Sequence, residues 1–372
     1  MLISRVKDLY FKFLSKFYKP FSVKANSALL IEFRSFHGET LPGYIKYLLD
    51  LEYSVDVVLP KSKKANGGDR NDGGLFSCFS TNSKVRVFFL SIHDINILSR
   101  SSIIFDYRHI VMNTFNDKIE RDYLSSVNLS RLKPVCVIHN PDIVNAYSQN
   151  IKMVSLVKMV SANQKSPLIV NPHYFGNFEK KTTKNNESNM ANFVTLNSKS
   201  LSRRNLNLLF QACDALYKRG IYNFSVKVIG KGIPIPDCYH SNIQDLGFQD
   251  FQQMYKEING ADFFLALIDQ ESIQYANKAS GTYQISYGFL KPLLLHRIFS
   301  EVSGFNNENS ILYDDNNALA DAMEKCINIP NDTYCNIVDA LEVSQKNLYN
   351  MSLNNLKKLL EDQAIEPPNP LR

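Results

Sequence analysis

The sequence predicts an α/β protein made of two consecutive Rossmann-like, doubly wound domains that face a central cleft. Three observations lead to this prediction. The chain has 372 residues, which is more than one core of ordinary size needs. Apolar runs typical of buried parallel strands alternate with helical patterns, and this alternation occurs twice along the chain. A polar segment without apolar periodicity, residues 179–190, separates the two stretches and is interpreted as a linker.

The first residues, 1–24, are predicted to form a basic amphipathic helix. Apolar side chains recur at the spacing of one helical face from Val6 to Phe17, with basic residues between them. Pro20 ends the pattern. Such a helix either lies in a membrane interface or docks on its own domain. The aromatic residues and the excess of lysine favour a peripheral membrane contact through residues 5–19.

Residues 25–178 are predicted to form the first domain. The apolar run at 28–33 is typical of a parallel strand buried on both faces, and helical periodicity follows over 39–53. The segment at 61–74 is polar and rich in glycine, as expected of a loop. Further apolar runs predict strands at 53–60, 84–90, 101–105, 134–139 and 166–171.

The second domain is predicted to span residues 191–345, where the alternation begins again. Strand-like runs alternate with amphipathic segments, and Gly220 closes the first helix. A C-terminal helix and tail, 346–372, follow it, and the prolines of the tail do not permit a helix. The predicted strands are 191–197, 224–232, 261–268 and 292–296, and the predicted helices are 203–220, 248–258, 280–290, 318–327 and 343–362.

The composition excludes several classes of protein. The net charge of +6 suits anionic partners such as nucleotide phosphates or a lipid surface, but it is too small for a dedicated nucleic-acid-binding protein. The six cysteines form no C-x-x-C pair, and none stands beside a histidine at metal-ligand spacing. Neither a disulfide framework nor a zinc site is therefore expected. No run reaches the ~18 apolar residues that a membrane span needs.

Four segments of the second half, taken in order, resemble the donor-binding domain of GT-B glycosyltransferases in the broad family-4-like group. They correspond to a strand with a loop and helix start, a strand with a glycine turn, a strand–helix–strand passage ending in an acidic loop, and a helix and strand that close the nucleotide site. Each is unspecific alone, but their order is specific. They cover residues 193–212, 224–232, 245–272 and 280–296.

This resemblance implies a metal-independent glycosyltransferase without a cofactor. It would transfer a sugar from a nucleotide-sugar donor to a carbohydrate or lipid-linked acceptor, with no nucleic-acid partner. A composition rich in Asn, Lys, Ser and Tyr and lacking tryptophan resembles bacterial surface-polysaccharide enzymes of the O-antigen, capsule and lipopolysaccharide type. We expect a cytoplasmic protein, peripheral on the inner face of the cytoplasmic membrane. The first domain fits the acceptor domain of such enzymes by its pattern alone.

A basic residue and a Ser-Gly-Thr triplet open the predicted helix 280–290. Lys278 supplies a charge, Ser280 and Thr282 supply hydroxyls, and Gly281 lets a phosphate approach the backbone. A helix N-terminus binds phosphate because its N–H groups are unpaired and carry partial positive charge. The alternative is an ordinary cap, in which the first hydroxyl bonds the first turn. Together with the order of the segments, the pattern favours a diphosphate cradle.

The resemblance assigns further donor-site residues outside the triplet. Arg204 occupies the position of the family's phosphate-contacting lysine, where a positive charge stabilises a leaving diphosphate. Lys199 stands in the same loop, and a solvated loop is the alternative there. Lys231 stands in the glycine turn after the second strand. Glu271 resembles the first glutamate of the family's paired-glutamate motif, with a surface carboxylate as the alternative.

The second glutamate of that motif is missing. Gln284 or Ile285 stands at its position, so recognition of the donor ribose departs from the family pattern. Two alternative functions stay open. One is a nucleotide-sugar epimerase of GT-B fold, which shares the architecture and donor site but needs no acceptor. The other is a non-catalytic interaction protein on the same fold, and the missing glutamate is the feature that favours it.

In the first domain, the loop after the first strand contains the candidate catalytic residues. His37 and Glu39 stand where GT-B enzymes place the loop that meets acceptor and donor, and either could take a proton from an acceptor hydroxyl. Gly38 and Gly43 are predicted to let a ligand approach this loop. A plain loop histidine and a first-turn carboxylate are the alternatives. Weaker candidates predicted at strand ends are Asp106 and His139.

Overall fold

The computed structural model describes residues 23–33, 37–61, 73–98, 101–115, 133–139, 151–159, 166–184, 190–198, 204–232, 234–272, 275 and 278–361. The chain divides into two compact units. Unit 1 comprises Met1–Tyr174 and Asn350–Arg372, and unit 2 comprises Phe175–Tyr349. The amphipathic helix predicted at 5–19 lies outside the described residues.

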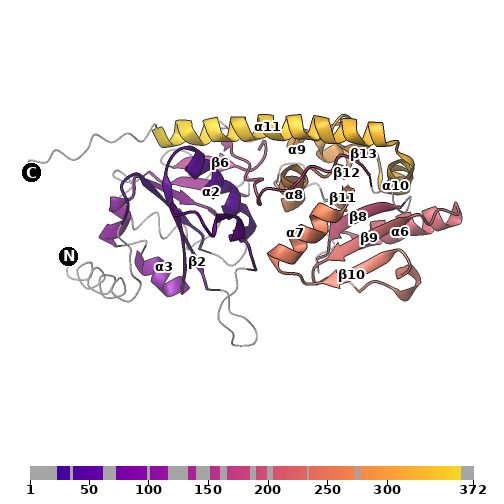
Figure 1. Cartoon of the computed structure of the whole chain (residues 1–372), viewed down its shortest axis with the longest axis horizontal. Helices are drawn as coiled ribbons and strands as arrows, with labels where there is room; N and C mark the ends of the chain where they lie inside the picture. Colours follow the sequence, from indigo (N-terminus) through magenta and orange to yellow (C-terminus); the bar gives the residue numbers. More distant parts are fainter. Residues whose placement is uncertain are drawn as a thin grey trace, which may run out of the picture. The chain divides into compact units, whose positions relative to one another are not determined.

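Unit 1 is built on a sheet of parallel strands in the order β3-β2-β1-β4-β5-β6-β7 (Figure 1). The order reverses between β1 and β4, which makes this the switch point of a doubly wound sheet. Ligands of such sheets bind at the carboxyl ends of the strands on either side of this point. The strands are β1 Ser27–Ile31, β2 Ser54–Pro60, β3 Val85–Leu90, β4 His109–Met112, β5 Val135–Ile138, β6 Lys152–Ser155 and β7 Leu168–Ile169.

The helix after the first strand packs one apolar stripe against this sheet. Leu41, Tyr44, Ile45 and Leu48 follow the spacing of one helical face, and all four are buried. A proline in the first turn is compatible with this start, because its missing N–H would have no helical partner there. The described helices of unit 1 before its C-terminal segment are η1 Gly38–Thr40, α2 Leu41–Asp50, η2 Ser77–Phe79, α3 Ile92–Leu98 and η3 Ser102–Asp106.

One predicted strand of unit 1 is wrong. Residues 101–105 lie mainly in the 3-10 helix η3, and the strand is instead β4 at His109–Met112. Both runs are short and apolar, and such runs alone do not distinguish a strand from another buried segment. Asp106 therefore ends a helical turn before β4 and does not follow a strand, so its predicted position at a strand end is also wrong.

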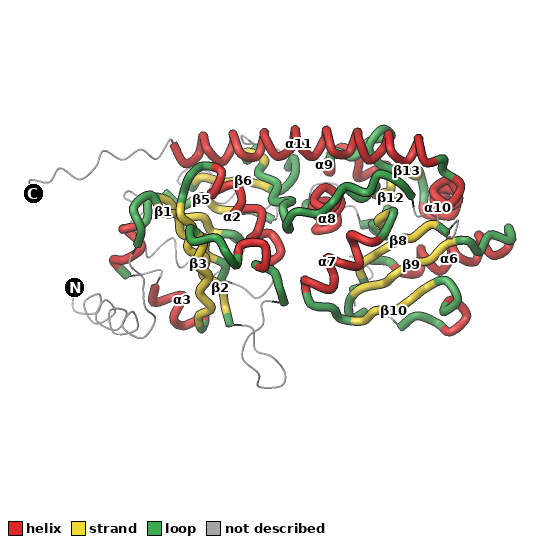
Figure 2. Tube along the Cα trace, viewed as in Figure 1, coloured by secondary structure: helices red, strands yellow, loops and turns green. Residues whose placement is uncertain are grey.

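Unit 2 contains the second parallel sheet, in the order β10-β9-β8-β11-β12-β13 (Figure 2). Its switch point lies between β8 and β11. The strands are β8 Ala191–Leu196, β9 Phe224–Ile229, β10 Ile243–Gly247, β11 Phe263–Leu265, β12 Leu293–His296 and β13 Ile311–Tyr313. The described helices are η4 Asp237–Tyr239, α6 Leu206–Lys218, α7 Phe251–Gly260, α8 Gly281–Phe289, η6 Arg297–Phe299, α9 Ser300–Ser303, η7 Asn316–Ala318 and α10 Leu319–Asn328.

The start of the predicted linker is attached to unit 2 through its lysines. The Lys180 ammonium donates to Glu342 at 2.7 Å, and the Lys181 ammonium donates to the fully buried Asp262 at 2.5 Å. Charge-assisted hydrogen bonds of this kind are stronger than neutral ones. Ion pairs thus attach this lysine-rich segment to unit 2. The polar composition alone, which led to the prediction of a linker, does not indicate this attachment.

The C-terminal helix α11, Asn331–Glu361, is longer than predicted and contributes to both units. It begins directly after Pro330, twelve residues before the predicted start at 343. In unit 2 the Ser344 hydroxyl accepts from Asn309 at 3.0 Å. In unit 1 the Ser352 hydroxyl accepts from the backbone N–H of Asn171 at 3.0 Å.

Candidate functional site

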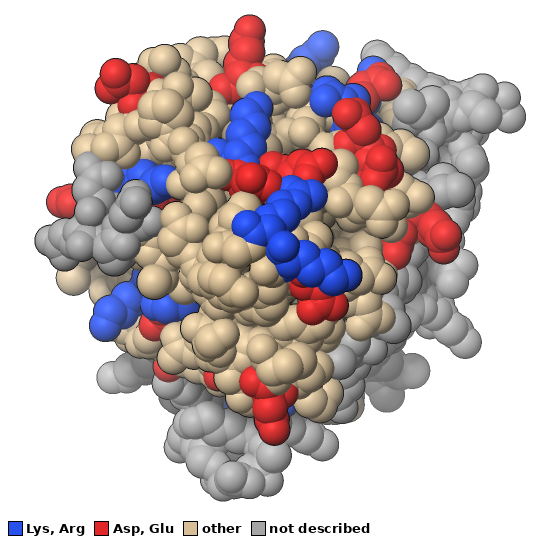
Figure 3. Space-filling model, turned by 90° about the vertical axis from the view of Figure 1, so that its right-hand side faces the viewer, with Lys and Arg blue, Asp and Glu red and all other residues tan. Residues whose placement is uncertain are grey.

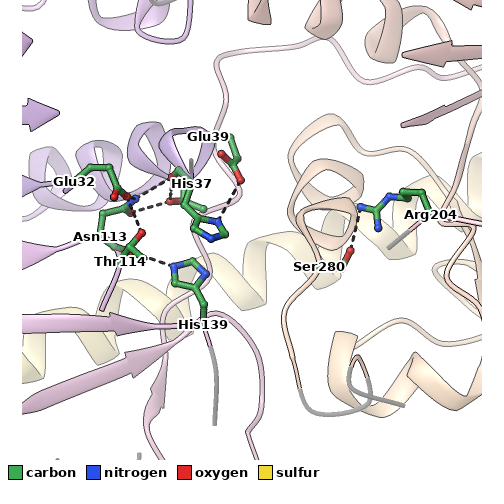
Figure 4. A network of polar contacts seen from close by, with 9 residues as sticks. Glu32, His37, Glu39, Asn113, Thr114, His139, Arg204 and Ser280 are labelled. Carbon is green, nitrogen blue, oxygen red and sulfur yellow. Dashed lines mark hydrogen bonds and ion pairs between the residues drawn. The ribbon is translucent and has the colours of Figure 1, made fainter. Parts of the chain in front are cut away.

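In unit 1, polar side chains from three neighbouring strands meet at the carboxyl ends of β1, β4 and β5 (Figure 4). Glu32 directly follows β1, Asn113 and Thr114 follow β4, and His139 follows β5. The loop after β1 adds His37. This is the switch-point edge of the sheet, where doubly wound folds bind ligands.

His37 stands at the centre of this group in an unusual backbone conformation. Its φ of 69° is left-handed, which for a residue with a side chain costs about 1–2 kcal/mol. Its ring stacks on the ring of His139, with centroids 4.2 Å apart and planes 23° from parallel. The imidazole is one-third exposed, so part of the ring is accessible to solvent.

Glu39 lies two residues further on and faces His37, with 3.7 Å between its Oε1 and the histidine Nδ1. Burial opposes ionisation of this carboxyl, but the close contact with His37 and the charges of His37 and His139 outweigh it. The net result is a lowered pKa for Glu39. The carboxylate is therefore ionised at neutral pH and can stabilise an imidazolium beside it.

A buried hydrogen-bond network lies behind His37. Glu32 Oε2 accepts from Asn113 Nδ2 at 2.6 Å and from the Thr114 hydroxyl at 2.7 Å. Asn113 Nδ2 also donates to the backbone carbonyl of His37 at 2.9 Å. His139 Nε2 lies 3.1 Å from the backbone carbonyl of Asn113, which can only accept, so this nitrogen carries the proton. Sequence reasoning missed the residues Glu32, Asn113 and Thr114, although each lies within two residues of the end of a strand.

The two glycines predicted to admit a ligand differ in their surroundings. A Cβ at Gly43 would lie 2.5 Å from the Cα of Pro172, so this glycine is required for packing inside unit 1. The prediction that Gly43 serves ligand approach is corrected accordingly. A Cβ at Gly38 would meet only Leu75 Cδ2 at 3.6 Å, an ordinary contact.

In unit 2, the structure brings together three of the predicted donor-site residues. Arg204 is buried at the start of α6, and its guanidinium donates to the hydroxyls of Ser280, at 3.3 Å, and Thr282 (Figure 4). The Ser280 hydroxyl lies 3.2 Å from that of Thr282. A guanidinium and two hydroxyls thus converge where α8 begins. The two hydroxyl residues are 76 and 78 positions away from the arginine in the sequence.

The start of α8 differs from an ordinary capped helix. Ser280 occupies the N-cap position, but its side chain makes no capping hydrogen bond within the described residues. Its hydroxyl is directed to Arg204 instead. Gly281 is exposed, and a Cβ there would meet nothing within 4 Å. Lys278 is partly exposed just before the helix. The N-terminal end of α8, which carries the positive end of the helix dipole, therefore lies next to the buried guanidinium of Arg204.

The acidic loop after β11 is organised by Asp269, which the sequence reasoning did not single out. Its carboxylate accepts from Asn205 at 2.7 Å, from Asn316 at 3.2 Å and from the Glu271 N–H at 3.0 Å. Burial opposes ionisation, but these hydrogen bonds lower the pKa of Asp269. The predicted Glu271 is exposed and supplies only its backbone N–H here. The available signal was its position directly after the apolar run at 261–268.

The remaining donor-site candidates lie apart from this group or outside the described residues. Lys231 is exposed, with its ammonium 5.9 Å from the centre of the Phe248 ring. Gln284 and Ile285, which stand where the family has its second glutamate, are both buried within α8. Lys199 lies outside the described residues.

A histidine at the end of β12 adds a neutral group to unit 2. His296 Nδ1 accepts from the Ile298 N–H at 3.2 Å, so its Nε2 carries the proton and donates to the Gln270 side chain at 3.2 Å. Burial lowers the pKa of His296, although the nearby carboxylates of Asp314 and Asp315 oppose this shift. Sequence reasoning named the segment but not this residue.

No family model and no curated protein matches this chain. Solved structures do match it over nearly its whole length. A glycosyltransferase from Rickettsia africae ESF-5 is 13% identical, with a TM-score of 0.58, over 92% of this chain and 100% of that one. Staphylococcus aureus TarM, in a complex with Fondaparinux, α-GlcNAc-glycerol and UDP, is 8% identical, with a TM-score of 0.61, over 90% and 99%.

A third match is an α,α-trehalose-phosphate synthase (UDP-forming) from Burkholderia vietnamiensis. It is 8% identical, with a TM-score of 0.53, over 90% of this chain and all of that one. The chain has the GT-B fold. The predicted fold class of two parallel Rossmann-like sheets is confirmed. At these identities the comparison establishes the fold alone.

Three observations bear on partners. Within the described ranges, no three His, Cys, Asp or Glu side chains gather as metal ligands would. No helix in that part of the chain is long and apolar enough to span a bilayer. On the face in Figure 3, described basic and acidic side chains are interspersed. Among the ion pairs of unit 2, Arg219 pairs with Asp321 and Glu324.

Proposed function

We propose that this protein is a glycosyltransferase that uses a nucleoside diphosphate sugar as donor. The observation that carries the proposal is the convergence of the buried Arg204, Ser280 and Thr282 at the first turn of α8, beside the exposed Gly281. This group lies at the switch-point edge of a Rossmann sheet. Structures of the same fold support it, since one holds UDP and another is a UDP-forming synthase.

The donor diphosphate would bind at the start of α8. Free N–H groups of the first turn, the helix dipole and the Arg204 cation all favour a dianionic group there. When the bond between the anomeric carbon and the diphosphate oxygen breaks, the nucleoside diphosphate leaves with the electron pair. A preorganised cation that faces this oxygen lowers the barrier, which is the role a metal plays in other transferases. We therefore propose metal-independent transfer.

The acceptor hydroxyl would react in the group around His37 and Glu39. As the hydroxyl oxygen forms its bond to the anomeric carbon, its proton must leave, and His37 is proposed to take it. The ionised Glu39 beside it stabilises the resulting imidazolium. A positioned base of this kind contributes roughly 10²–10⁴-fold to a rate.

The acceptor is proposed to be a carbohydrate or a lipid-linked saccharide of a bacterial surface polysaccharide. This finer proposal rests on the composition and on the basic amphipathic pattern of residues 5–19, which would hold the protein at the cytoplasmic face of the membrane. A vesicle-flotation assay with anionic and zwitterionic liposomes tests it. Residues 24–372 alone should lose the binding to anionic vesicles that the full chain has.

A thermal-shift screen with UDP, GDP, dTDP and CMP tests the donor site. A nucleotide at a hundred times its Kd stabilises the folded state by about 2.7 kcal/mol. We expect one nucleotide to raise the melting temperature, and Arg204→Ala and Ser280→Ala to remove this rise. Arg219→Ala is the matched control, because Arg219 is a surface arginine paired with Asp321 and Glu324.

The outcomes of this screen separate the candidate functions. A shift with no nucleotide would contradict the donor site. A shift with one nucleotide but no transfer to any acceptor, with UDP released from UDP-GlcNAc alone, would favour an epimerase. Tight binding without any turnover would favour an interaction protein.

A further inference from the structure

The buried network behind His37 takes no part in the proposed proton transfer. Glu32 and Asn113 are both fully buried, and Thr40 and Thr114 are nearly so. Burying a carboxylate and an amide is costly unless each finds hydrogen-bond partners. These partners include the backbone of a candidate catalytic residue, His37.

Asn113 uses its side-chain amide and its backbone carbonyl in four contacts. One amide hydrogen goes to Glu32 Oε2 at 2.6 Å, and the other goes to the backbone carbonyl of His37 at 2.9 Å. Its Oδ1 accepts from the Thr40 hydroxyl at 2.8 Å. Its own backbone carbonyl lies 3.1 Å from His139 Nε2. A single buried residue therefore contacts both of the stacked histidines.

The contact with His37 is made to its backbone and bears on its conformation. The His37 carbonyl receives the Asn113 amide and lies 2.7 Å from the Thr40 hydroxyl. This carbonyl belongs to a residue held at a left-handed φ of 69°, a conformation that surrounding structure must impose. The hydrogen bond from the Asn113 amide to the carbonyl fixes the direction in which the imidazole leaves the backbone.

We propose that Asn113 is a positioning residue, which holds the His37 imidazole against His139 and Glu39 through the His37 backbone carbonyl. Glu32 orients the Asn113 amide by accepting its first hydrogen, so that the second is directed to His37. The role in turnover rests on the proposed function, whereas the placement of the ring can be measured without any substrate.

Two threonines of the network provide a matched pair of variants. Thr40→Val and Thr114→Val each replace one buried hydroxyl by a methyl group of the same shape. The Thr40 hydroxyl contacts the His37 carbonyl and Asn113, whereas the Thr114 hydroxyl donates to Glu32 Oε2. Asn113→Ala removes the proposed positioning residue itself. If that variant does not fold, Thr40→Val carries the test.

The first readout is the position of the ring. Histidine side-chain NMR spectra of the seven histidines, assigned with His37→Gln and His139→Gln, report the ring-current shift that each stacked imidazole exerts on the other. We expect Asn113→Ala and Thr40→Val to abolish this shift and Thr114→Val to preserve it. An unchanged shift in Asn113→Ala and Thr40→Val would overturn the proposal, as would an equal loss in Thr114→Val.

The second readout is turnover of a nucleotide sugar. The thermal-shift screen identifies which nucleotide this donor contains. Since a misplacement of about 1 Å can cost 10²-fold, we expect kcat to fall about 10²-fold in Asn113→Ala and about 10-fold in Thr40→Val. The donor KM should stay within about 2-fold, because the donor site is in unit 2. A rise in KM without a fall in kcat would contradict positioning. If the wild type turns over no nucleotide sugar, the proposed function fails, and the NMR result alone decides the placement of His37.

Discussion

The two units place polar groups at equivalent edges of similar sheets but hold them in different ways. In unit 1, a strained histidine is held by a buried carboxylate–amide network and lies beside an ionised glutamate. In unit 2, a buried guanidinium is held by two hydroxyls at the start of a helix. The first arrangement suits proton transfer, and the second suits binding of an anion. Similar sheets thus support distinct chemistry through the residues that follow their strands.

Arg204→Ala should have the largest effect. Loss of the guanidinium removes the cation from the start of α8, and we expect kcat/KM for the nucleotide sugar to fall about 10²–10³-fold, as for the loss of one preorganised donor. Arg204→Lys should recover part of this loss, since it keeps the charge but not the planar fork. Steady-state kinetics check both variants, with Arg219→Ala as the control. Full activity in Arg204→Ala would remove the basis for the donor site.

His37→Ala should affect the chemical step and leave the donor site intact. We expect kcat to fall about 10²-fold, at the lower end of general-base catalysis, while the thermal shift with nucleotide stays at its wild-type size. The combined measurement distinguishes the two units, because Arg204→Ala should change both quantities. If His37→Ala also abolishes the nucleotide-induced shift, the division of roles is wrong.

One glycine in each unit can be replaced by alanine to compare a close-packed position with an open one. Gly43→Ala should destabilise the protein by about 1–3 kcal/mol, because its Cβ would overlap Pro172. Gly281→Ala meets open space and should leave stability unchanged, but it should weaken nucleotide binding if a phosphate approaches that backbone. Denaturant unfolding and nucleotide titration on both variants measure the contrast. Wild-type nucleotide affinity in Gly281→Ala would place the phosphates elsewhere.

The pH dependence of stability should differ between the units. Burial, followed by the nearby Lys181, lowers the pKa of Lys291 in unit 2 to about 7. Between this value and the unfolded pKa of about 10.4, the unfolded chain binds more protons, so stability should rise with pH over that window. Lys291→Met should remove this rise. Urea unfolding at pH 7, 8.5 and 10 checks it, and an equal slope in the variant would contradict the assignment.

The smallest effect is expected from Glu39 in unit 1. Its pKa is lowered in the folded protein, so its contribution to stability is present above the unfolded pKa of about 4.3 and is lost as the pH falls through the folded pKa. Because the side chain is partly exposed, the contribution should be small. The difference in unfolding midpoint between wild type and Glu39→Gln should be present at pH 7 and vanish at acid pH. A difference that grows towards acid would have the wrong sign.

The strand framework could be predicted because buried parallel strands are encoded by short continuous apolar runs. One exception was β4, since two apolar runs follow each other at 101–105 and 109–112 and only the second extends into the sheet. The short strands β6 and β13 were not predicted either. The start of α11 was missed although Tyr334, Ile337, Val338 and Leu341 follow the spacing of one helical face and are all buried. The failure at β4 arises where tertiary packing decides between local alternatives, whereas the signal for the start of α11 was present in the sequence.

The candidate site was predictable where a motif carries it and unpredictable where distant residues meet. The Ser-Gly-Thr triplet and Arg204 were named from their surroundings, but their contact joins positions 76 and 78 residues apart. Glu32 and Asn113 meet across 81 residues, and neither belongs to a recognisable pattern. Only the sheet order, which places β1 next to β4, brings these two residues together.

The central claim is that the start of α8 binds the diphosphate of a nucleotide, and calorimetric titration tests it most directly. For the base identified in the screen, the nucleoside, its monophosphate and its diphosphate are titrated into wild type and Arg204→Ala. We expect the diphosphate to bind wild type at least about 10-fold, or 1.4 kcal/mol, more tightly than the monophosphate. This preference should disappear in the variant. Equal affinities in wild type, or a preference that survives in Arg204→Ala, would contradict it.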